Sequence, residues 1–161
     1  MITKMLSFDT SSTITGYAYW ENGALIVSGV LSHVKEKNTT SRIENMTVDI
    51  INLLKKHEPD IVVVEQPPLC NSPKTCVMLA ELVGCVKGYA LFNNADYVEF
   101  KVNEWRKLIA GKDEKVPYRR NEAKEWAIQK VLKLYNQDVA DDNEADAILI
   151  GQARINQFIN I

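Results

Sequence analysis

Asp60-Ile61-Val62-Val63-Val64-Glu65-Gln66-Pro67-Pro68 is the stretch from which the fold can be worked out. Its run of β-branched apolar residues predicts a strand that is buried on both faces, which is typical of parallel or mixed sheets. Glu65 ends the strand, and the prolines after it cannot extend the hydrogen-bond ladder. Ligands of open α/β sheets bind outside the carboxyl ends of the strands. Glu65 is therefore a candidate functional residue, although an acid that merely reaches solvent would give the same pattern.

A second copy of this pattern lies near the start of the chain. Met5-Leu6-Ser7-Phe8-Asp9 is a short apolar stretch that ends in an acid, and the Ser/Thr-rich loop Thr10 to Thr13 follows it. If the two strands are parallel neighbours, Asp9 and Glu65 lie about 5 Å apart, which is the spacing between strands. Carboxylates at that distance repel each other, so we expect a divalent cation between them.

The length and composition predict one globular domain. The 161 residues, 46% of them apolar and 25% charged, suit a single soluble domain over 1–161. No run of about 18 apolar residues and no signal-peptide pattern is found, so we expect a cytoplasmic protein without a membrane span. The cysteines, Cys70, Cys76 and Cys85, lack the spacing of a zinc site and are predicted to be buried, reduced thiols.

Charge is distributed unevenly along the chain. The net charge is −2, yet residues 101–133 hold ten Lys and Arg against five Asp and Glu. A basic segment beside an acidic cluster is typical of a metal-dependent enzyme that acts on a phosphate polymer. A helical surface with solvated lysines would give the same composition, so charge alone does not decide between the two.

Turn signals and periodicity predict the remaining elements. Strands are predicted over 4–9, 16–20, 24–31 and 96–100, and the Asn22-Gly23 pair predicts a hairpin between the second and third. Helices are predicted over about 40–57, 73–92, 102–109, 119–135 and from about 142 onward, with a capping box at Ser41 and Glu44 and a flexible loop over 112–118. The chain thus opens with an antiparallel meander and continues with alternating helices and strands.

The helix predicted over 73–92 is apolar on nearly all sides. Such a helix is buried within the fold, docked against another subunit, or both. Gly84 and Gly88 are four residues apart and would allow a second helix to approach closely.

The last predicted helix begins with a cluster of acids, Asp141-Asp142-Asn143-Glu144-Ala145-Asp146. Capping and the helix dipole explain one or two of them. They do not explain Asp146, which lies at least one turn inside the helix and directly before an apolar run. A carboxylate on the inward side of a helix needs a partner, and a metal ion is one candidate. Two Mg²⁺ ions about 4 Å apart could activate a water and stabilise the leaving oxygen of a phosphodiester.

At these residues the chain resembles the RuvC family of Holliday-junction resolvases, within the ribonuclease H-like superfamily. The resemblance rests on Phe8 to Thr13 with Gly16, on Val63-Val64-Glu65-Gln66 and on Ala145-Asp146-Ala147, and it runs across nearly the whole chain. Phage-encoded members look most similar. It implies an α/β, ribonuclease H-like fold with a five-stranded mixed sheet, three antiparallel strands and then two parallel ones, flanked by helices. It also implies a homodimer formed through the helix around Val77 to Leu91.

The resemblance further implies Mg²⁺-dependent cleavage of four-way and other branched DNA junctions, with Mn²⁺ as a substitute ion. The implied metal ligands are Asp9, Glu65 and Asp146. The family usually has a second acid three residues before Asp146, and this chain has Asn143 there. Either Asp142 takes over from the neighbouring position, or Asn143 ligates through its carbonyl oxygen. The implied DNA contacts are Leu69, as a wedge in place of the family's aromatic residue, and Arg106, Lys107, Lys112, Lys115, Arg119, Arg120 and Lys124.

Three other functions stay open on the sequence alone. The chain is a weakly active or inactive branched-DNA-binding protein if Asn143 disables the site. It is another ribonuclease H-like nuclease if it cuts RNA–DNA hybrids, although such an enzyme needs no apolar dimer helix. A fragment of a sugar kinase or actin-like ATPase would share the loop after Asp9, but the chain lacks the second lobe that closes over a nucleotide.

Overall fold

The computed structural model describes residues 3–67, 72–112 and 114–159. Its centre is a five-stranded sheet of order β3-β2-β1-β4-β5. The strands are β1 (Lys4–Asp9), β2 (Ile14–Glu21), β3 (Ala24–Ser32), β4 (Ile61–Glu65) and β5 (Asp96–Phe100). β1, β2 and β3 pair antiparallel, whereas β4 runs parallel to both β1 and β5. The predicted mixed sheet is confirmed.

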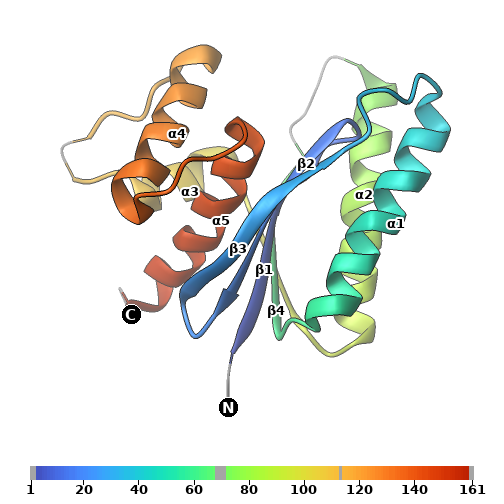
Figure 1. Cartoon of the computed structure of the whole chain (residues 1–161), viewed down its shortest axis with the longest axis horizontal. Helices are drawn as coiled ribbons and strands as arrows, with labels where there is room; N and C mark the ends of the chain where they lie inside the picture. The colour runs from blue at the N-terminus through green and yellow to red at the C-terminus, as the bar shows by residue number, and fades with distance from the viewer. Residues whose placement is uncertain (1–2, 68–71, 113, 160–161) are drawn as a thin grey trace.

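Helices cover both faces of this sheet (Figure 1). α1 (Thr39–His57) and α2 (Pro73–Phe92) lie on one face, and α3 (Val102–Ile109), α4 (Arg120–Tyr135) and α5 (Asp142–Ile159) lie on the other. Val62 and Val64 belong to the hydrophobic core on the α1–α2 side, and Ile61 and Val63 belong to the core on the opposite side. Because alternate residues of a strand point to opposite faces, a strand between two cores is apolar without interruption.

The turns and helix ends follow the chemistry of their residues. Asn22 (φ 52°) and Gly23 (φ 81°) both adopt the left-handed conformation that a tight hairpin turn requires. α1 begins after Asn38, whose side-chain oxygen accepts a hydrogen bond from the Ser41 backbone N–H at 3.1 Å. The predicted capping box at Ser41 was therefore wrong, because Asn38 already supplies the cap from outside the helix. α1 ends at His57, and the C-cap residue Glu58 is left-handed at φ 45°.

Two glycines let α5 lie directly on the sheet. A Cβ at Gly16 of β2 would come within 1.9 Å of the backbone oxygen of Asn143. A Cβ at Gly151 of α5 would come within 2.4 Å of the Trp20 ring nitrogen and 2.6 Å of Ser7 Oγ. Any larger residue would push the helix outward, so these contacts hold α5 close to β1 and β2.

α2 is covered on one face only. Leu82, Val83, Val86 and Ala90 are buried, but Val77, Leu91 and Phe92 are 57%, 59% and 88% exposed. A Cβ added at Gly84 or Gly88 would meet nothing within 4 Å. By length and composition alone α2 could cross a membrane, at a mean hydropathy of 1.5, whereas the sequence predicted no membrane span. One face nevertheless packs on the sheet and α1, so the prediction of burial within the fold holds for that face.

The cysteine prediction was wrong at the described positions. Cys85 is a free thiol but is exposed, and Cys76 is disulfide-bonded. Cys70 lies outside the described residues. Burial fails at Cys85 because it lies on the uncovered face of α2.

The segment before α4 is anchored at Glu114 rather than being a free loop. The Glu114 carboxylate accepts hydrogen bonds from Trp126 Nε1 at 2.6 Å and from the Gly111 N–H at 3.2 Å, and it also pairs with Lys130. These contacts lower the pKa of Glu114 to about 2, the largest effect being that of Lys130.

Candidate active site

The ends of β1 and β4 bring two acids to one edge of the sheet. Phe8 pairs with Val64 in the parallel register, so Asp9 and Glu65 follow side by side. Burial raises the pKa of Asp9 well above its ordinary value, and the negative charges of Asp146, Glu65, Asp142 and Asp141 raise it further, in that order. The structure thus brings the three predicted carboxylates, Asp9, Glu65 and Asp146, within electrostatic reach of one another.

Asp146 lies on the side of α5 that faces this edge. Burial raises its pKa to about 7, the Arg106 guanidinium opposes that change, and the charges of Glu65 and Asp142 add to it. Arg106 Nη2 lies 3.8 Å from Asp146 Oδ2. The other oxygen, Oδ1, is buried and has no hydrogen-bond partner in the part of the chain that the structure describes. A buried oxygen without a partner is unfavourable, and a cation would relieve that cost.

Glu65 is held by Trp105, a residue to which the sequence assigned no role in the site. Trp105 Nε1 donates a hydrogen bond to Glu65 Oε2 at 2.6 Å, and the Trp105 side chain is completely buried. Burial raises the pKa of Glu65, whereas this hydrogen bond and the charge of Arg106 lower it. The contact joins α3 to the end of β4. No local pattern in the sequence could have indicated it, because it depends on how α3 packs against the sheet.

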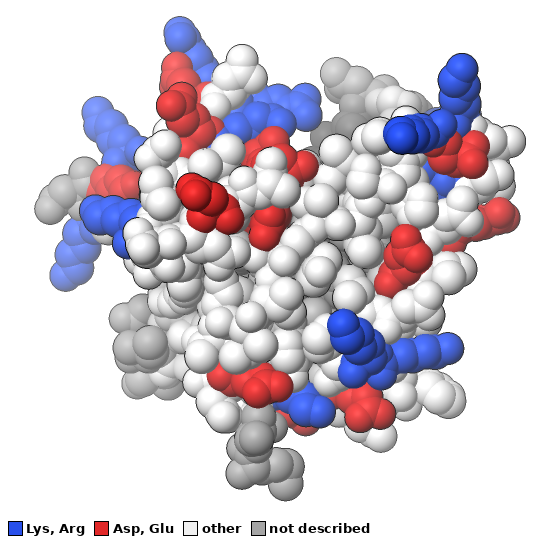
Figure 2. Space-filling model, in the orientation of Figure 1, with Lys and Arg blue, Asp and Glu red and all other residues white. Residues whose placement is uncertain are grey.

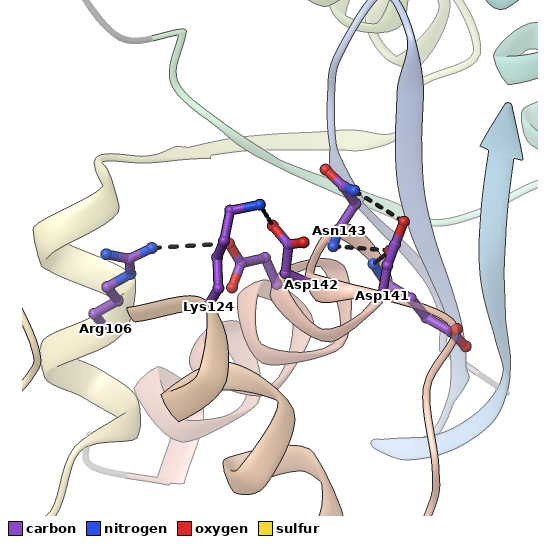
Figure 3. A network of polar contacts seen from close by, with 7 residues as sticks. Arg106, Lys124, Asp141, Asp142 and Asn143 are labelled. Carbon is purple, nitrogen blue, oxygen red and sulfur yellow. Dashed lines mark hydrogen bonds and ion pairs between the residues drawn. The ribbon is translucent and has the colours of Figure 1, made fainter. Parts of the chain in front are cut away.

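The acids at the start of α5 divide into different roles (Figure 3). Asp141 Oδ1 accepts hydrogen bonds from the backbone N–H groups of Asn143 at 2.9 Å and Glu144 at 3.1 Å, so Asp141 caps the helix. Asp142 Oδ2 lies 2.5 Å from Lys124 Nζ of α4. The amide nitrogen of Asn143 donates to Asp141 Oδ2 at 3.0 Å, which leaves its carbonyl oxygen as the atom that could bind a cation.

Glu144 has a structural role. It is buried, and Ser28 Oγ donates to its Oε1 at 2.6 Å. The Ala140 backbone N–H donates to its Oε2 at 2.7 Å. Glu144 therefore ties β3 to the segment before α5, and this contact helps to set the direction in which α5 leaves that segment.

The donor set suits a hard divalent cation. Carboxylate and amide oxygens are the ligands that Mg²⁺ and Mn²⁺ prefer. Within residues 3–67, 72–112 and 114–159, no group of three or more acid, histidine or cysteine side chains is placed so that it could hold a metal ion. Glu65 faces Trp105, and Asp142 faces Lys124. The raised pKa values and the partnerless Asp146 oxygen show that negative charge here is only partly balanced.

The predicted DNA-contacting residues lie in different parts of the structure rather than in one patch. Arg106 and Lys124 reach the acidic cluster. The side chains exposed on or before α4 are Lys112, Lys115, Arg119 and Arg120. Figure 2 shows Lys and Arg gathered, with acids among them, over the region where Figure 1 places the start of α4. Lys107 lines a hollow with Glu104 and Gln157. Leu69 lies outside the described residues.

Known proteins resemble the chain over nearly its whole length. The model of a family described as "Lactococcus phage M3 protein" matches residues 2–153. The crossover junction endodeoxyribonuclease RuvC of Brachyspira hyodysenteriae is 26% identical over 158 residues, which cover 95% of this chain and 92% of that protein.

Solved structures show the same fold. T. thermophilus RuvC in complex with Holliday junction substrate superposes with a TM-score of 0.75 at 13% identity, over 98% of this chain and 96% of that one. The fowlpox virus resolvase in complex with Holliday junction DNA superposes with a TM-score of 0.60 at 18% identity, over 99% of both chains. The ribonuclease H-like fold and the resemblance to RuvC are thereby confirmed.

Proposed function

We propose that this chain, which belongs to the family described as "Lactococcus phage M3 protein", is a RuvC-like endodeoxyribonuclease. It would cut four-way and other branched DNA junctions. Curated relatives carry the name crossover junction endodeoxyribonuclease RuvC, and structural neighbours were solved with Holliday junction DNA. Residues 1–161 would act as one nuclease domain. Such an enzyme would meet its substrate in the cytoplasm of the phage's host.

The observation that carries this proposal is the meeting of Asp9, Glu65 and Asp146 at one edge of the sheet. Three distant parts of the chain deliver them, and both burial and mutual repulsion raise the pKa of Asp9 and Asp146. A fold that needed only stability would not gather acids with partly balanced charge in a partly buried place. A ligand of positive charge would therefore balance these three carboxylates when the protein acts.

That partner would be Mg²⁺, two ions to a site, with Mn²⁺ able to substitute. Asp9, Glu65 and Asp146 would hold the ions, together with Asp142 or the carbonyl oxygen of Asn143. When bound, the ions would activate a water for attack and stabilise the leaving 3′ oxygen. The partnerless oxygen of Asp146 and the oxygen-only donor set support this choice.

The basic residues beside the acids would receive the DNA backbone. Lys124 and Arg106 each pair with a carboxylate of the cluster, at 2.5 Å and 3.8 Å. Once cations neutralise the acids, these side chains can turn to the phosphate that is cut. Lys112, Lys115, Arg119 and Arg120 would contact phosphates farther along the junction, giving an affinity that falls steeply with salt. Lys107 would contribute from the periphery, and Leu69 stays the proposed wedge.

A second copy of the chain would cover the exposed face of α2. Val77, Gly84, Gly88 and Leu91 recur at intervals of three, four or seven residues, so they share one side of the helix. The glycines are open to solvent, and the apolar side chains around them are more than half exposed. A two-fold dimer buries the same patch on both subunits and places two sites in symmetric register for two nicks.

The test is cleavage of a synthetic four-way junction with and without Mg²⁺, read on a denaturing gel. We expect Mg²⁺-dependent nicking that Glu65→Gln abolishes while junction binding is kept or tightened, because one negative charge is removed from the phosphate site. Glu99→Gln, an exposed acid on the adjacent strand, is the matched control and should cut normally. Glu65→Gln cutting at the unaltered rate would show that the active site lies elsewhere.

A second candidate is a branched-DNA-binding protein without nuclease activity. Asn143 in place of an acid and the tight pairing of Asp142 with Lys124 favour it. It would be supported if the unaltered chain binds junctions but nicks none at any Mg²⁺ or Mn²⁺ concentration. Preferential cutting of RNA–DNA hybrids would instead indicate another ribonuclease H-like nuclease.

A further inference from the structure

The side chain of Trp105 connects the hydrophobic core to the acidic cluster. Its ring is fully buried in the core beneath α3, α4 and α5. Its Nε1–H emerges at one point and donates to Glu65 Oε2 at 2.6 Å. The Arg106 guanidinium lies 5.0 Å from the centre of the same ring and 3.8 Å from Asp146. Trp105 and Arg106, which are consecutive in α3, therefore contact Glu65 and Asp146, two of the three carboxylates.

The chemistry of an indole makes this contact directional. An indole N–H donates one hydrogen bond and accepts none, so it can hold a carboxylate oxygen but cannot ligate a cation. A hydrogen bond to an ionised acceptor is stronger than a neutral one. Because the ring is packed on all sides, its N–H cannot follow Glu65 if that side chain rotates. The glutamate must instead adopt the rotamer that meets the fixed donor.

We propose that Trp105 is a positioning residue for Glu65: it fixes one carboxylate oxygen and leaves the other for the cation shared with Asp9. This inference rests on the proposed nuclease function and adds to it a residue that lies outside the carboxylate set. Lysine or arginine at this place would also bind the carboxylate, but either would add a positive charge that competes with the cation. A neutral donor orients the ligand without that competition.

The chain contains a matched control for this contact. Trp126 Nε1 donates to Glu114 at 2.6 Å, the same pair of groups at the same distance. The two tryptophan rings belong to one cluster, with centroids 6.4 Å apart. The Trp126 contact anchors the segment before α4 and does not touch the three carboxylates. Trp105→Phe and Trp126→Phe thus each remove an indole–carboxylate hydrogen bond, one at a proposed metal ligand and one at the segment that carries the proposed DNA contacts Lys112 and Lys115.

The kinetic test measures single-turnover cleavage of a four-way junction at saturating protein, together with junction affinity. We expect Trp105→Phe to lower the cleavage rate by about 10- to 100-fold, the range for a misplaced catalytic group, at unchanged affinity. Trp126→Phe should cut at the unaltered rate. Replacing Trp105 by benzothienylalanine, which keeps the ring shape but lacks the N–H, should reproduce the loss and so exclude a cavity effect. A benzothienylalanine protein with normal activity, or equal losses in both phenylalanine variants, would overturn the proposal.

A second measurement needs no cleavage. The chain has three tryptophans, so its indole N–H groups give three proton–nitrogen NMR signals, assigned by replacing each tryptophan in turn. The Trp105 signal should shift on Glu65→Gln and on titration with Mg²⁺ alone, while the Trp126 signal stays in place. A Trp105 signal that ignores both changes would overturn the positioning role. If the NMR shifts occur but no substrate is cut, the nuclease function fails and the contact to Glu65 stands.

Discussion

At the scale of single residues, the site is defined by acids whose charge the protein only partly balances. Asp146 shows this most clearly, because one oxygen faces Arg106 at 3.8 Å and the other is buried without a partner in the described chain. Burial raises the pKa of this carboxyl from 3.8 to about 7. A cation would lower that pKa again, so pH and metal should act on the same groups.

The first prediction concerns the stability of the metal-free protein. Asp146 has a pKa of about 7 in the fold against 3.8 ordinarily, so the fold binds a proton that the unfolded chain releases. The stability from this group is complete below pH 3.8 and is lost as pH rises to about 7 and beyond, by a few kcal/mol at most, since one pKa unit is about 1.4 kcal/mol. His57, whose pKa burial lowers, acts in the opposite direction. Thermal unfolding in EDTA at pH 5 and pH 8, for the unaltered chain and Asp146→Asn, measures the difference.

We expect the unaltered chain to lose more stability than Asp146→Asn between these two pH values, and Mg²⁺ to restore it at pH 8 in the unaltered chain. Equal losses in the two proteins would mean that Asp146 does not titrate in this range.

The second prediction separates the roles of Asp142 and Asn143. If Asn143 replaces a ligating acid, Asn143→Asp should lower the Mg²⁺ concentration needed for half-maximal cleavage, because the ion gains one negative ligand. If Asp142 is the ligand, Asp142→Ala should abolish cleavage and Asn143→Asp should change little. Asp141→Asn, at the helix cap, serves as a comparison of similar charge change. A Mg²⁺ dependence that none of these variants alters would place the start of α5 outside the site.

At the scale of elements, α2 and α5 show opposite solutions for an apolar helix. α5 is pressed onto the sheet through Gly16 and Gly151. α2 leaves its own glycines, Gly84 and Gly88, open to solvent. Small residues thus permit close packing of α5 on the sheet, whereas the glycines of α2 are free to pack against a second chain.

The third prediction concerns this open face of α2. Leu91→Glu places a charge in the proposed dimer contact, so it should convert a dimer to a monomer and reduce the paired nicking of two strands of like polarity. Val48→Glu on α1 is the control, since Val48 is 56% exposed but lies on another helix. Sedimentation velocity at micromolar concentration reports the change. An unaltered chain that is monomeric under these conditions would contradict the interface.

At the scale of the whole molecule, the charge lies where a junction would have to dock. The acids gather at the carboxyl ends of β1 and β4, and α3, α4 and the segment between them bring basic side chains to that end of the sheet. The basic side chains would attract a polyanion such as DNA to this surface, and the neighbouring acids would bind cations.

The fourth prediction tests the DNA surface. Replacing Arg119 and Arg120 by alanine should weaken junction binding and flatten its dependence on salt by about one unit of slope for each lost phosphate contact. The single-turnover rate at saturating DNA should stay the same. Lys55 and Lys56, in the last turn of α1, are the control pair, since both are exposed and they lie on the other face of the sheet. An unchanged slope would move the DNA surface elsewhere.

The sequence alone determined the elements and the order of the early strands, and it predicted the three acids that the structure brings to one edge of the sheet. Alternating or continuous apolar runs, Asn22-Gly23 and the prolines after Glu65 act through neighbouring residues, so they can be interpreted without coordinates. Asp9 and Glu65 could be paired for the same reason, because both end apolar strands.

The tertiary structure alone decided what surrounds those acids. Trp105 donates a hydrogen bond to Glu65, and Lys124 pairs with Asp142. Glu114 anchors the segment before α4, which was predicted to be flexible. It also decided which face of α2 stays open and that Cys85 is exposed. These contacts join residues far apart in the chain, and only the packing of α3, α4 and α5 on the sheet sets the distances between them. Patterns of local periodicity carry no information about such distances.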